Sequence, residues 1–171
     1  MSLSFDGTDD FAQTDATFTF SSGIATASYW LKWTTNADDD DGVMHFGITD
    51  GVFNQFIVDH NSSTGGVLEA YESGTLGNRS ESITRPSTAT WHHYAFVFDH
   101  STDTGDVKIY LNGVEQSTTI VSNNKSGTGF GTYALAFMKV FYAPATTTFG
   151  AGKMAFPTIY NRELNANEVK Q

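Results

Sequence analysis

The sequence contains no cysteine in its 171 residues, and only three residues are proline. No disulfide can staple the fold, no thiol can act as a nucleophile, and a disordered proline-rich segment is excluded. No run reaches the roughly 18 consecutive apolar residues that a membrane-spanning helix needs. The first residues, MSLSFDGTDDF, lack the basic region and the apolar stretch of a secretory signal. We therefore expect a protein made in the cytosol, without membrane insertion.

Basic residues are also scarce, because nine lysines and arginines stand against 19 acidic residues and give a net charge of −10. Residues 1–72 carry twelve acidic residues and one lysine, whereas residues 73–171 carry seven acidic and eight basic residues. Nucleic acids and anionic membranes would meet a repulsive field, so the sequence predicts no nucleic acid partner. Acidity favours solubility and attracts divalent cations, but it identifies no partner by itself.

Aromatic residues, in contrast, make up 14% of the chain, and glycines number 16. Short runs of alternating apolar and polar residues, separated by turns, predict an all-β protein built as a two-sheet antiparallel jelly-roll sandwich. The chain fits a single domain, residues 1–171, that buries about 70% of its unfolded surface. Strands are expected at residues 17–20, 25–33, 43–48, 52–58, 67–71, 94–98, 107–111 and 154–160.

Three further segments have specific local signals. Residues 133–142 are apolar on both faces, which fits one strand covered on both sides or two strands joined by a bend at Lys139. Pro157 implies an edge strand or a bulge, because proline cannot donate to a sheet ladder. Asn165 is a good N-cap, and Glu168 three residues later completes a capping box. One short helical turn is therefore expected at the C-terminal end.

Residues 91–115, WHHYAFVFDHSTDTGDVKIYLNGVE, contain two alternating apolar runs around a polar turn. Both faces of the first run carry bulky side chains, which is typical of a central strand. Asn-Gly supplies the positive φ that a tight hairpin turn requires. We expect a structural hairpin defined by Trp91, His93, Tyr110, Asn112 and Gly113.

This stretch resembles the "W-H-H-x-A … I-Y-x-N-G" hairpin of laminin G-like domains, which belong to the concanavalin A-like lectin/glucanase superfamily of jelly rolls. LSFDGTDDF at residues 3–11 resembles the opening strand of that family, and SYWLK at residues 28–32 resembles its "s-x-W-v-K" strand. Residues 149–168 resemble its closing "f-x-G … i-Y-N-R-x-L-s-x-x-E". The resemblance spans nearly the whole chain and fades between residues 116 and 148. It implies a jelly roll, frequent glycan binding, and a structural hydrogen-bonding role for His92 and His93.

Enzyme activity is not expected from the glutamates. Glucanases of the superfamily that the chain resembles place carboxylates as E-x-D-x-x-E along one strand, so that two of them face one cleft. None of the six glutamates begins such a motif, and Glu69 and Glu72, three apart in a predicted strand, would point to opposite faces. Neither G-x-S-x-G nor a P-loop is present. An unusual glycanase stays as an alternative.

Two groups of residues are candidate metal ligands. His92 and His93 are adjacent in a predicted strand, so they point to opposite faces and cannot chelate one ion together. The run NADDDDG at residues 36–42 forms a predicted loop whose carboxylates suit Ca²⁺, although it lacks the spaced D-x-D-x-D-G pattern and equally fits a solvated loop. The calcium candidates are Asp38, Asp39, Asp40 and Asp41. No other cofactor is expected.

Glycan binding, which the resemblance implies, needs exposed aromatic faces beside polar groups. Trp33, Phe53 and Tyr142 lie near predicted loops and are the candidates, although each fits the core or the rim of the sandwich equally well.

The chain consists of little more than this domain, without cysteine or linker. We therefore expect a non-enzymatic structural and recognition module, most simply a decoration or attachment protein on the surface of a virion such as a bacteriophage capsid. It would be made in the host cytoplasm. Its partners would be the larger assembly, further copies of the chain in a homo-oligomer, or glycans, with avidity from many copies. The alternative is a stand-alone carbohydrate-binding domain of a secreted protein.

Overall fold

The structure, a computed structural model, describes residues 1–13, 18–20, 24–33, 41–47, 55–61, 67–74, 77–84, 86–87, 89–99, 107–123, 133–135, 137–140, 142–143, 148–149 and 151–170. Side chains are described for residues 1–12, 24–33, 82–84, 86–87, 89–99, 107–120 and 151–170.

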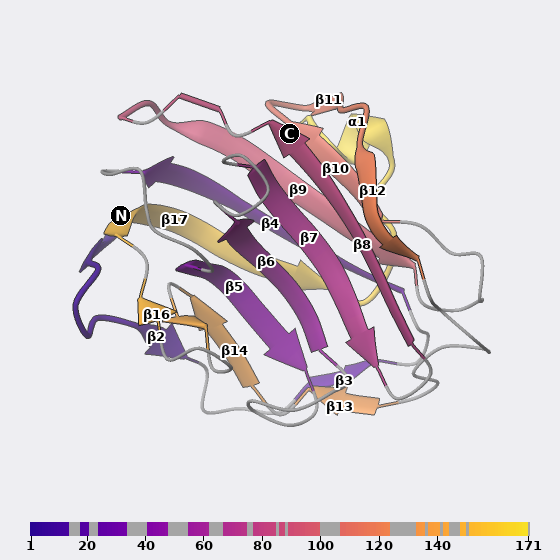
Figure 1. The fold of residues 1–171 in the computed structure, drawn as a ribbon, viewed down its shortest axis with the longest axis horizontal. Coiled ribbons are helices and arrows are strands. Elements are labelled where there is room, and N and C mark those ends of the chain that lie inside the picture. Colours follow the sequence, from indigo (N-terminus) through magenta and orange to yellow (C-terminus); the bar gives the residue numbers. More distant parts are fainter. Residues whose placement is uncertain are drawn as a thin grey trace.

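Two large antiparallel sheets form the described part of the chain (Figure 1). The first has six strands, in the order β1 (Leu3–Asp6), β17 (Ala151–Tyr160), β4 (Ile24–Trp33), β9 (His92–Asp99), β10 (Val107–Leu111) and β11 (Val114–Glu115). The second has seven, in the order β12 (Thr119–Asn123), β8 (Gly77–Thr84), β7 (Val67–Gly74), β6 (Gln55–Asn61), β5 (Asp41–Gly47), β14 (Phe137–Val140) and β2 (Ala12–Gln13). Two short pairs join β3 (Phe18–Phe20) to β13 (Tyr133–Leu135) and β15 (Tyr142–Ala143) to β16 (Thr148–Phe149).

The expected fold class is confirmed, because the protein is an all-β antiparallel sandwich that ends in one short helix, α1 (Ala166–Val169). Within the described residues, no helix combines the length and the apolar character that crossing a membrane requires. The capping box is present as predicted: the Asn165 side chain accepts from the backbone N–H groups of Asn167 and Glu168, and the Glu168 carboxylate accepts from the backbone N–H of Asn165.

The inner face of the six-stranded sheet supplies the core. Alternate residues of β4 and β9 point inward because successive strand side chains lie on opposite faces. Tyr94, Phe96 and Phe98 of β9 stack along the strand, with ring centroids 6.0 and 6.5 Å apart. Ile83 of β8 joins the same cluster from the opposite sheet. The inward side chains of β4, each at most 1% exposed, are Ala25, Ala27, Tyr29, Leu31 and Trp33.

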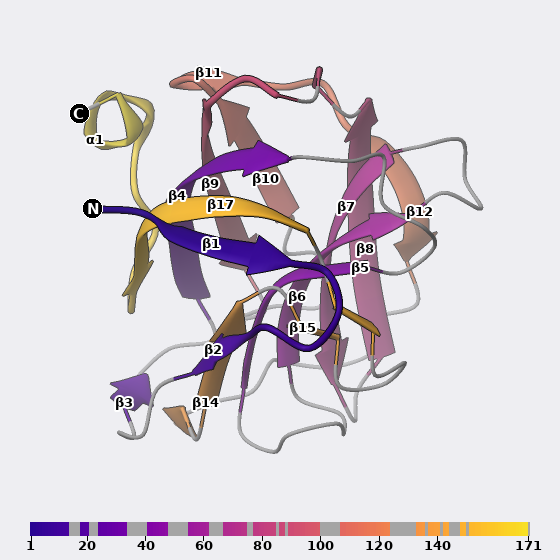
Figure 2. The ribbon, with the colours of Figure 1, turned by 90° about the vertical axis from the view of Figure 1, so that its left-hand side faces the viewer.

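The outer face of this sheet is covered in part by the C-terminal segment. Ala95, Val97 and Tyr110 form a second apolar cluster with Leu164 and Val169. Figure 2 shows α1 on the side of the six-stranded sheet that faces away from β7 and β8. Both faces of β9 are therefore buried, as the bulky residues on both sides of its sequence predicted.

Thr26 of β4, fully buried, ties the C-terminal segment to the sheet. Its hydroxyl donates to the backbone carbonyl of Arg162 at 2.8 Å and accepts from the backbone N–H of Leu164 at 3.1 Å. These bonds satisfy two backbone groups at the point where the chain leaves β17 and enters α1.

Several predicted boundaries need correction. Residues 133–142 are neither one strand nor two strands bent at Lys139, because β13, β14 and β15 belong to three different sheets and Lys139 lies inside β14 opposite His45. The loop predicted at residues 36–42 ends earlier, since β5 begins at Asp41, which pairs with His60. The bulge predicted from Pro157 is confirmed by the register shift between Ala155 and Thr158.

We predict that Thr26→Val lowers the free energy of unfolding by about 1–3 kcal/mol, since it leaves one carbonyl and one N–H without their partner at nearly constant volume. Urea unfolding followed by fluorescence would measure the change. Thr119→Val, the same substitution at an exposed position of β12, is the matched control and should change stability by less than about 0.5 kcal/mol. Equal effects of the two substitutions would show that Thr26 does not hold the C-terminal segment.

Candidate functional site

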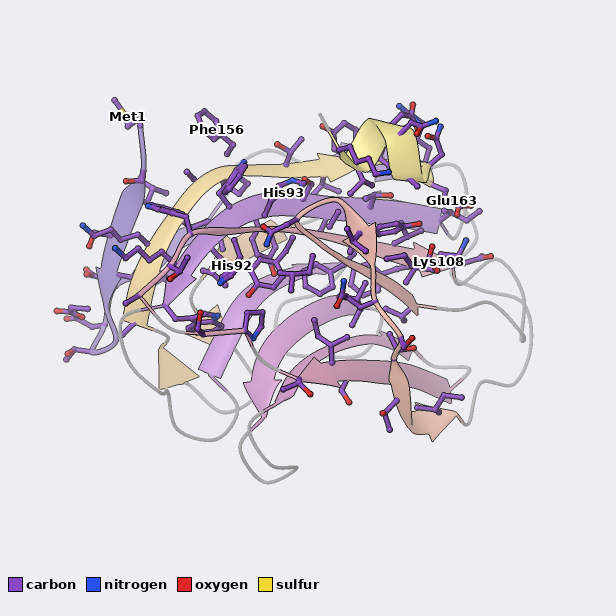
Figure 3. All side chains as sticks on the ribbon, turned by 90° about the horizontal axis from the view of Figure 1, so that it is seen from above. Met1, His92, His93, Lys108, Phe156 and Glu163 are labelled. Atoms are coloured by element: carbon purple, nitrogen blue, oxygen red, sulfur yellow. The ribbon has the colours of Figure 1, made fainter. Side chains whose placement is uncertain are left out.

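The two adjacent histidines of β9 lie on opposite faces of the sheet (Figure 3). His92 is on the inner side, where its ring meets that of Tyr94 at a centroid distance of 6.2 Å. His93 is on the outer side, 5.3 Å between centroids from the ring of Trp30, which is its cross-strand neighbour in β4. The two rings therefore cannot share a metal ion.

The Asn112-Gly113 turn fixes the end of the hairpin beside His93. Both residues have positive φ, 50° and 78°, which Asn and Gly tolerate better than other residues. The backbone N–H of Asn112 donates to the carbonyl of His93 at 2.8 Å, and the backbone N–H of His93 donates to Asn112 Oδ1 at 2.9 Å. The Asn112 amide also lies 3.2 Å from His92 Nδ1.

Gly113 brings the C-terminal end of the chain against this turn. A Cβ atom at Gly113 would lie 2.8 Å from Cγ of Lys170, so only glycine permits the approach. The hairpin turn and the residue that follows α1 are thus in van der Waals contact. This contact closes one side of a surface depression.

The depression, called here the Trp30 hollow, has a volume of about 190 Å³ on the outer face of the six-stranded sheet. It brings together β4, β9, the hairpin turn and the end of α1, which are far apart in the sequence. Its lining residues are Trp30, His93, Asn112, Gly113, Val169 and Lys170.

The residues that line the Trp30 hollow carry polar groups without a hydrogen-bond partner among the described residues. The Trp30 side chain is 43% exposed, and its indole N–H has no hydrogen-bond partner among the described residues. The same holds for the ammonium of Lys170 and for Nδ1 of His93, whose Nε2 lies 2.9 Å from the Ser28 hydroxyl. Such groups are available to a ligand without loss of an internal bond.

Lysines without ion pairs surround Trp30 on the same face. Lys32 is two residues from Trp30 in β4 and pairs in register with Lys153 of β17. Neither lysine, nor Lys170, forms an ion pair with the described part of the chain. Lys108 and Arg162 on this face are paired, with Glu163 at 2.6 Å and Glu168 at 2.9 Å. The outer face therefore carries three lysines that no described acidic residue pairs with, although the whole chain carries −10.

Partial burial lowers the pKa of His93 below the ordinary value of 6.5. The imidazole is therefore neutral at pH 7, with one nitrogen donating and the other accepting. Since Nε2 faces a hydroxyl, which can donate or accept, Nδ1 can take either role toward a ligand.

A second polar group, on the N-terminal loop, was not anticipated as a metal site. Carboxylate oxygens of Asp6, Asp9 and Asp10 lie within 4.8 Å of one another, all on exposed residues. Two of them serve the local turn, because Asp6 Oδ1 accepts from the Thr8 backbone N–H and Asp10 Oδ2 accepts from the Asp6 backbone N–H. The donor set suits a hard cation such as Ca²⁺. The sequence signal is the D-G-x-D-D spacing around Gly7, whose φ is 84°.

The residues predicted for calcium and glycan binding do not form one site among the described residues. Trp33 is only 1% exposed and packs in the core, so the expectation that it offers an aromatic face is wrong. Its position in β4 has the same parity as Tyr29 and Leu31, which point inward. Tyr142 lies in β15, where its backbone pairs with Phe149, and Asp41 begins β5. Asp38, Asp39, Asp40 and Phe53 lie outside the described residues.

Among the exposed aromatic residues of the described chain, Trp30 is the one that lines a hollow. Its outward direction could be read from the sequence, because Trp30 lies between Tyr29 and Leu31 and successive strand residues point to opposite faces. Lys170 could not be found that way, because its position beside Gly113 depends on how the C-terminal segment folds back over the sheet.

We predict that His93 makes stability fall as the pH decreases below 6.5. Because its pKa is lowered in the folded state, protons bind the unfolded chain more strongly, and stability is lost as the pH falls from the unfolded value toward the folded one. Urea midpoints at pH 5 and pH 7.5 would measure the difference. His93→Gln should reduce it relative to the native chain, and an unchanged or larger difference in this variant would contradict the prediction.

Comparison with solved structures reveals the same fold in proteins of low sequence identity. A heptameric SAP-like pentraxin from Limulus polyphemus superposes with a TM-score of 0.71 at 15% identity, over 99% of this chain and 79% of that one. The botulinum neurotoxin serotype G binding domain gives 0.61 at 13% identity, over 99% and 45%. Domains LG4-5 of the mouse laminin α1 chain give 0.61 at 9% identity, over 96% and 44%. The chain thus spans less than half the length of the last two structures.

The sequence matches no curated protein. It does match one family over residues 6–170, the concanavalin A-like lectin/glucanases superfamily in its laminin G form. This match agrees with the sandwich, with the hairpin of β9 and β10, and with the solved structures. The chain belongs to the concanavalin A-like lectin/glucanases superfamily, as a laminin G-like domain.

Proposed function

We propose that the chain is a non-catalytic recognition module that binds its partner through the outer face of the six-stranded sheet. The observation that carries this proposal is the Trp30 hollow, where a half-exposed indole lies beside polar groups without internal partners. Exposed aromatic residues with a few placed polar groups are the usual composition of a binding site.

The three glutamates whose side chains the structure describes support a role without catalysis, because each of them holds a structural contact. Glu115 accepts from the Tyr110 hydroxyl at 3.1 Å, Glu163 pairs with Lys108, and Glu168 pairs with Arg162 and caps α1. A glycosidase needs two carboxylates that face one cleft, one of them free to protonate the leaving group. These three side chains are committed elsewhere.

The names of the structural neighbours point the same way. They include a receptor binding domain of botulinum neurotoxin type G and a pentraxin that is heptameric. These neighbours of the same fold include a binding domain and an oligomer of seven copies. Both are consistent with the recognition role proposed for this chain.

We further propose that the chain acts as a decoration or attachment protein on a larger assembly such as a virion surface. Many copies on one particle would raise the effective strength of individually weak contacts. The broadly negative charge of the chain would limit nonspecific attachment to nucleic acid and to anionic membranes. The second candidate, favoured by the aromatic and polar lining of the Trp30 hollow, is a carbohydrate-binding domain without a particle.

Affinity electrophoresis tests the recognition role. We predict that gels containing a neutral β-glucan retard the chain, while reducing-end assays detect no release of sugar. Trp30→Ala should weaken retardation at least about tenfold, the effect of removing a central aromatic contact. Ile120→Ala removes another exposed apolar side chain, 55% exposed on β12, and should leave retardation unchanged. Release of reducing ends, or full retardation of the Trp30 variant, would contradict the proposal.

Sedimentation tests the decoration role. We predict that the chain in its native source sediments with a large particle at physiological salt. Recovery of free monomer alone would contradict decoration and would leave the carbohydrate-binding domain as the better account.

A further inference from the structure

We propose that Asn112 is a modification site, where spontaneous deamidation converts the side-chain amide to a carboxylate, and that the C-terminal segment shields this site. The C-terminal segment is residues 161–170, the chain that follows β17 and contains α1. Asn112-Gly113 is the one Asn-Gly step in the sequence. Glycine after asparagine favours the reaction, because it has no side chain that hinders the attacking backbone nitrogen. The proposal does not depend on the recognition function.

The reaction consumes water and releases ammonia. The backbone nitrogen of Gly113 loses its proton to hydroxide and attacks Cγ of Asn112, which forms a new C–N bond. The side-chain nitrogen takes a proton from water and leaves as ammonia, which restores the hydroxide. Water then opens the cyclic imide at one of its two carbonyl carbons. Cleavage of the new bond gives aspartate, whereas cleavage of the original peptide bond gives isoaspartate, in which the backbone runs through Cγ.

Hydrogen bonds to β9 hold the Asn112 carboxamide away from this reaction. Its Oδ1 accepts from the backbone N–H of His93 at 2.9 Å, and its Nδ2 lies 3.2 Å from Nδ1 of His92. The backbone N–H of Asn112 donates to the His93 carbonyl at 2.8 Å and fixes the turn. The carboxamide has to turn away from both histidines before its Cγ can meet the nitrogen of the next residue. We therefore expect the folded turn to react slowly.

The stem of Lys170 covers the residue that supplies the attacking nitrogen. Gly113 is buried, whereas Asn112 beside it is exposed. A Cβ atom built at Gly113 would lie 2.8 Å from Cγ of Lys170 and 3.4 Å from its Cα. Lys170 is itself exposed, so its aliphatic stem lies on the turn while its ammonium can reach water. This cover limits the access of hydroxide to the Gly113 nitrogen.

The cover belongs to a part of the chain that can open locally. Helix α1 has four residues, and a single helical turn has little stability of its own. Leu164 and Val169 attach the segment to the apolar cluster on β9 and β10, and Thr26 binds its backbone. Chain ends with few contacts detach at a lower free energy than the whole domain unfolds. Deamidation of Asn112 should therefore follow detachment of the C-terminal segment.

The two products would affect the turn differently. Because Asn112 Oδ1 accepts from a backbone N–H, its Nδ2 donates to His92 Nδ1, and the proton of the neutral ring then lies on Nε2. This Nε2 is buried and has no hydrogen-bond partner among the described residues. A carboxylate at position 112 would accept a proton from Nδ1 instead, which leaves a buried acceptor in place of a buried donor. Isoaspartate adds a backbone atom to the turn and would disturb its pairing and the lining of the Trp30 hollow.

Peptide mass spectrometry after incubation at mildly alkaline pH measures the rate at Asn112, and chromatography separates the aspartate and isoaspartate peptides. We expect the folded chain to react at least about tenfold more slowly than the chain unfolded in guanidinium chloride, the effect of two hydrogen bonds that must break first. Equal rates in the folded and unfolded chain would overturn the proposal. An unfolded chain that stays unmodified at Asn112 would overturn it as well.

Two substitutions of Lys170 separate the cover from the charge. Lys170→Ala removes the Cγ that lies against Gly113, and it should raise the rate in the folded chain about fourfold, the effect of one buried methylene on an opening equilibrium. Lys170→Met keeps Cγ and removes the charge, so its rate should equal that of the native chain. An equal rise in both variants would trace the effect to charge, and an unchanged rate in Lys170→Ala would exclude the cover. Either result would overturn the shielding.

Val169→Ala tests the attachment of the segment without a change at the turn. Val169 is 3% exposed within the apolar cluster, so loss of two methyl groups should raise the rate about tenfold. Val114→Ala is the matched control, because Val114 follows Gly113 directly and is 60% exposed, and it should leave the rate unchanged. Circular dichroism verifies that both variants are folded. A native rate in folded Val169→Ala would overturn the role of the segment, and the Lys170 pair decides if this variant does not fold.

Discussion

The structure depends on the burial of β4 and β9 from both sides. Their inward residues build the aromatic core against the seven-stranded sheet, and part of their outward residues are covered by Leu164 and Val169. The C-terminal segment is short, however. It covers the outward side chains of Ala95 and Val97 but leaves the neighbouring cross-strand pair, Trp30 and His93, partly open. The limit of this cover is what leaves an aromatic surface open. Thr26 sets that limit, because its hydroxyl fixes where the chain turns from β17 toward α1.

The same arrangement separates charge on the molecule. The acidic residues are concentrated in residues 1–72, whereas the outer face of the six-stranded sheet draws basic residues from β4, β10, β17 and the C-terminal segment. Two of these cations are neutralised by glutamates that also brace the segment, while Lys32, Lys153 and Lys170 have no such partner among the described residues. Net charge therefore describes this face poorly, since three of its lysines have no ion pair among the described residues although the whole chain carries −10.

Much of the fold could be predicted from the sequence, because strand alternation is a local signal. The alternation in β4, β9 and β10, the Asn-Gly turn, the Pro157 bulge and the Asn165 cap are each readable within a few residues. β8 and β12 were not predicted, because their polar residues hide the period of two. The position of Trp33 near a predicted loop favours a binding role, yet its parity in β4 places it in the core. Lys170 joins the hollow only through the fold of the C-terminal segment against Gly113, which no local pattern reveals.

The bulge in β17 turns an aromatic side chain outward from the sandwich. Ala155 pairs with Trp30 and Thr158 with Ser28, so both Phe156 and Pro157 lie opposite the single residue Tyr29. In a regular strand Phe156 would alternate inward; here it adopts φ of 53° and is 68% exposed, pointing away from both sheets (Figure 3). A residue other than glycine in this conformation costs about 1–3 kcal/mol and exposes an apolar ring to water. The outward position of Phe156 adds nothing to the core, because Met154 and Ile159 on either side of the bulge already pack there. An aromatic side chain that points outward near Trp30 is instead consistent with the recognition function proposed for this face.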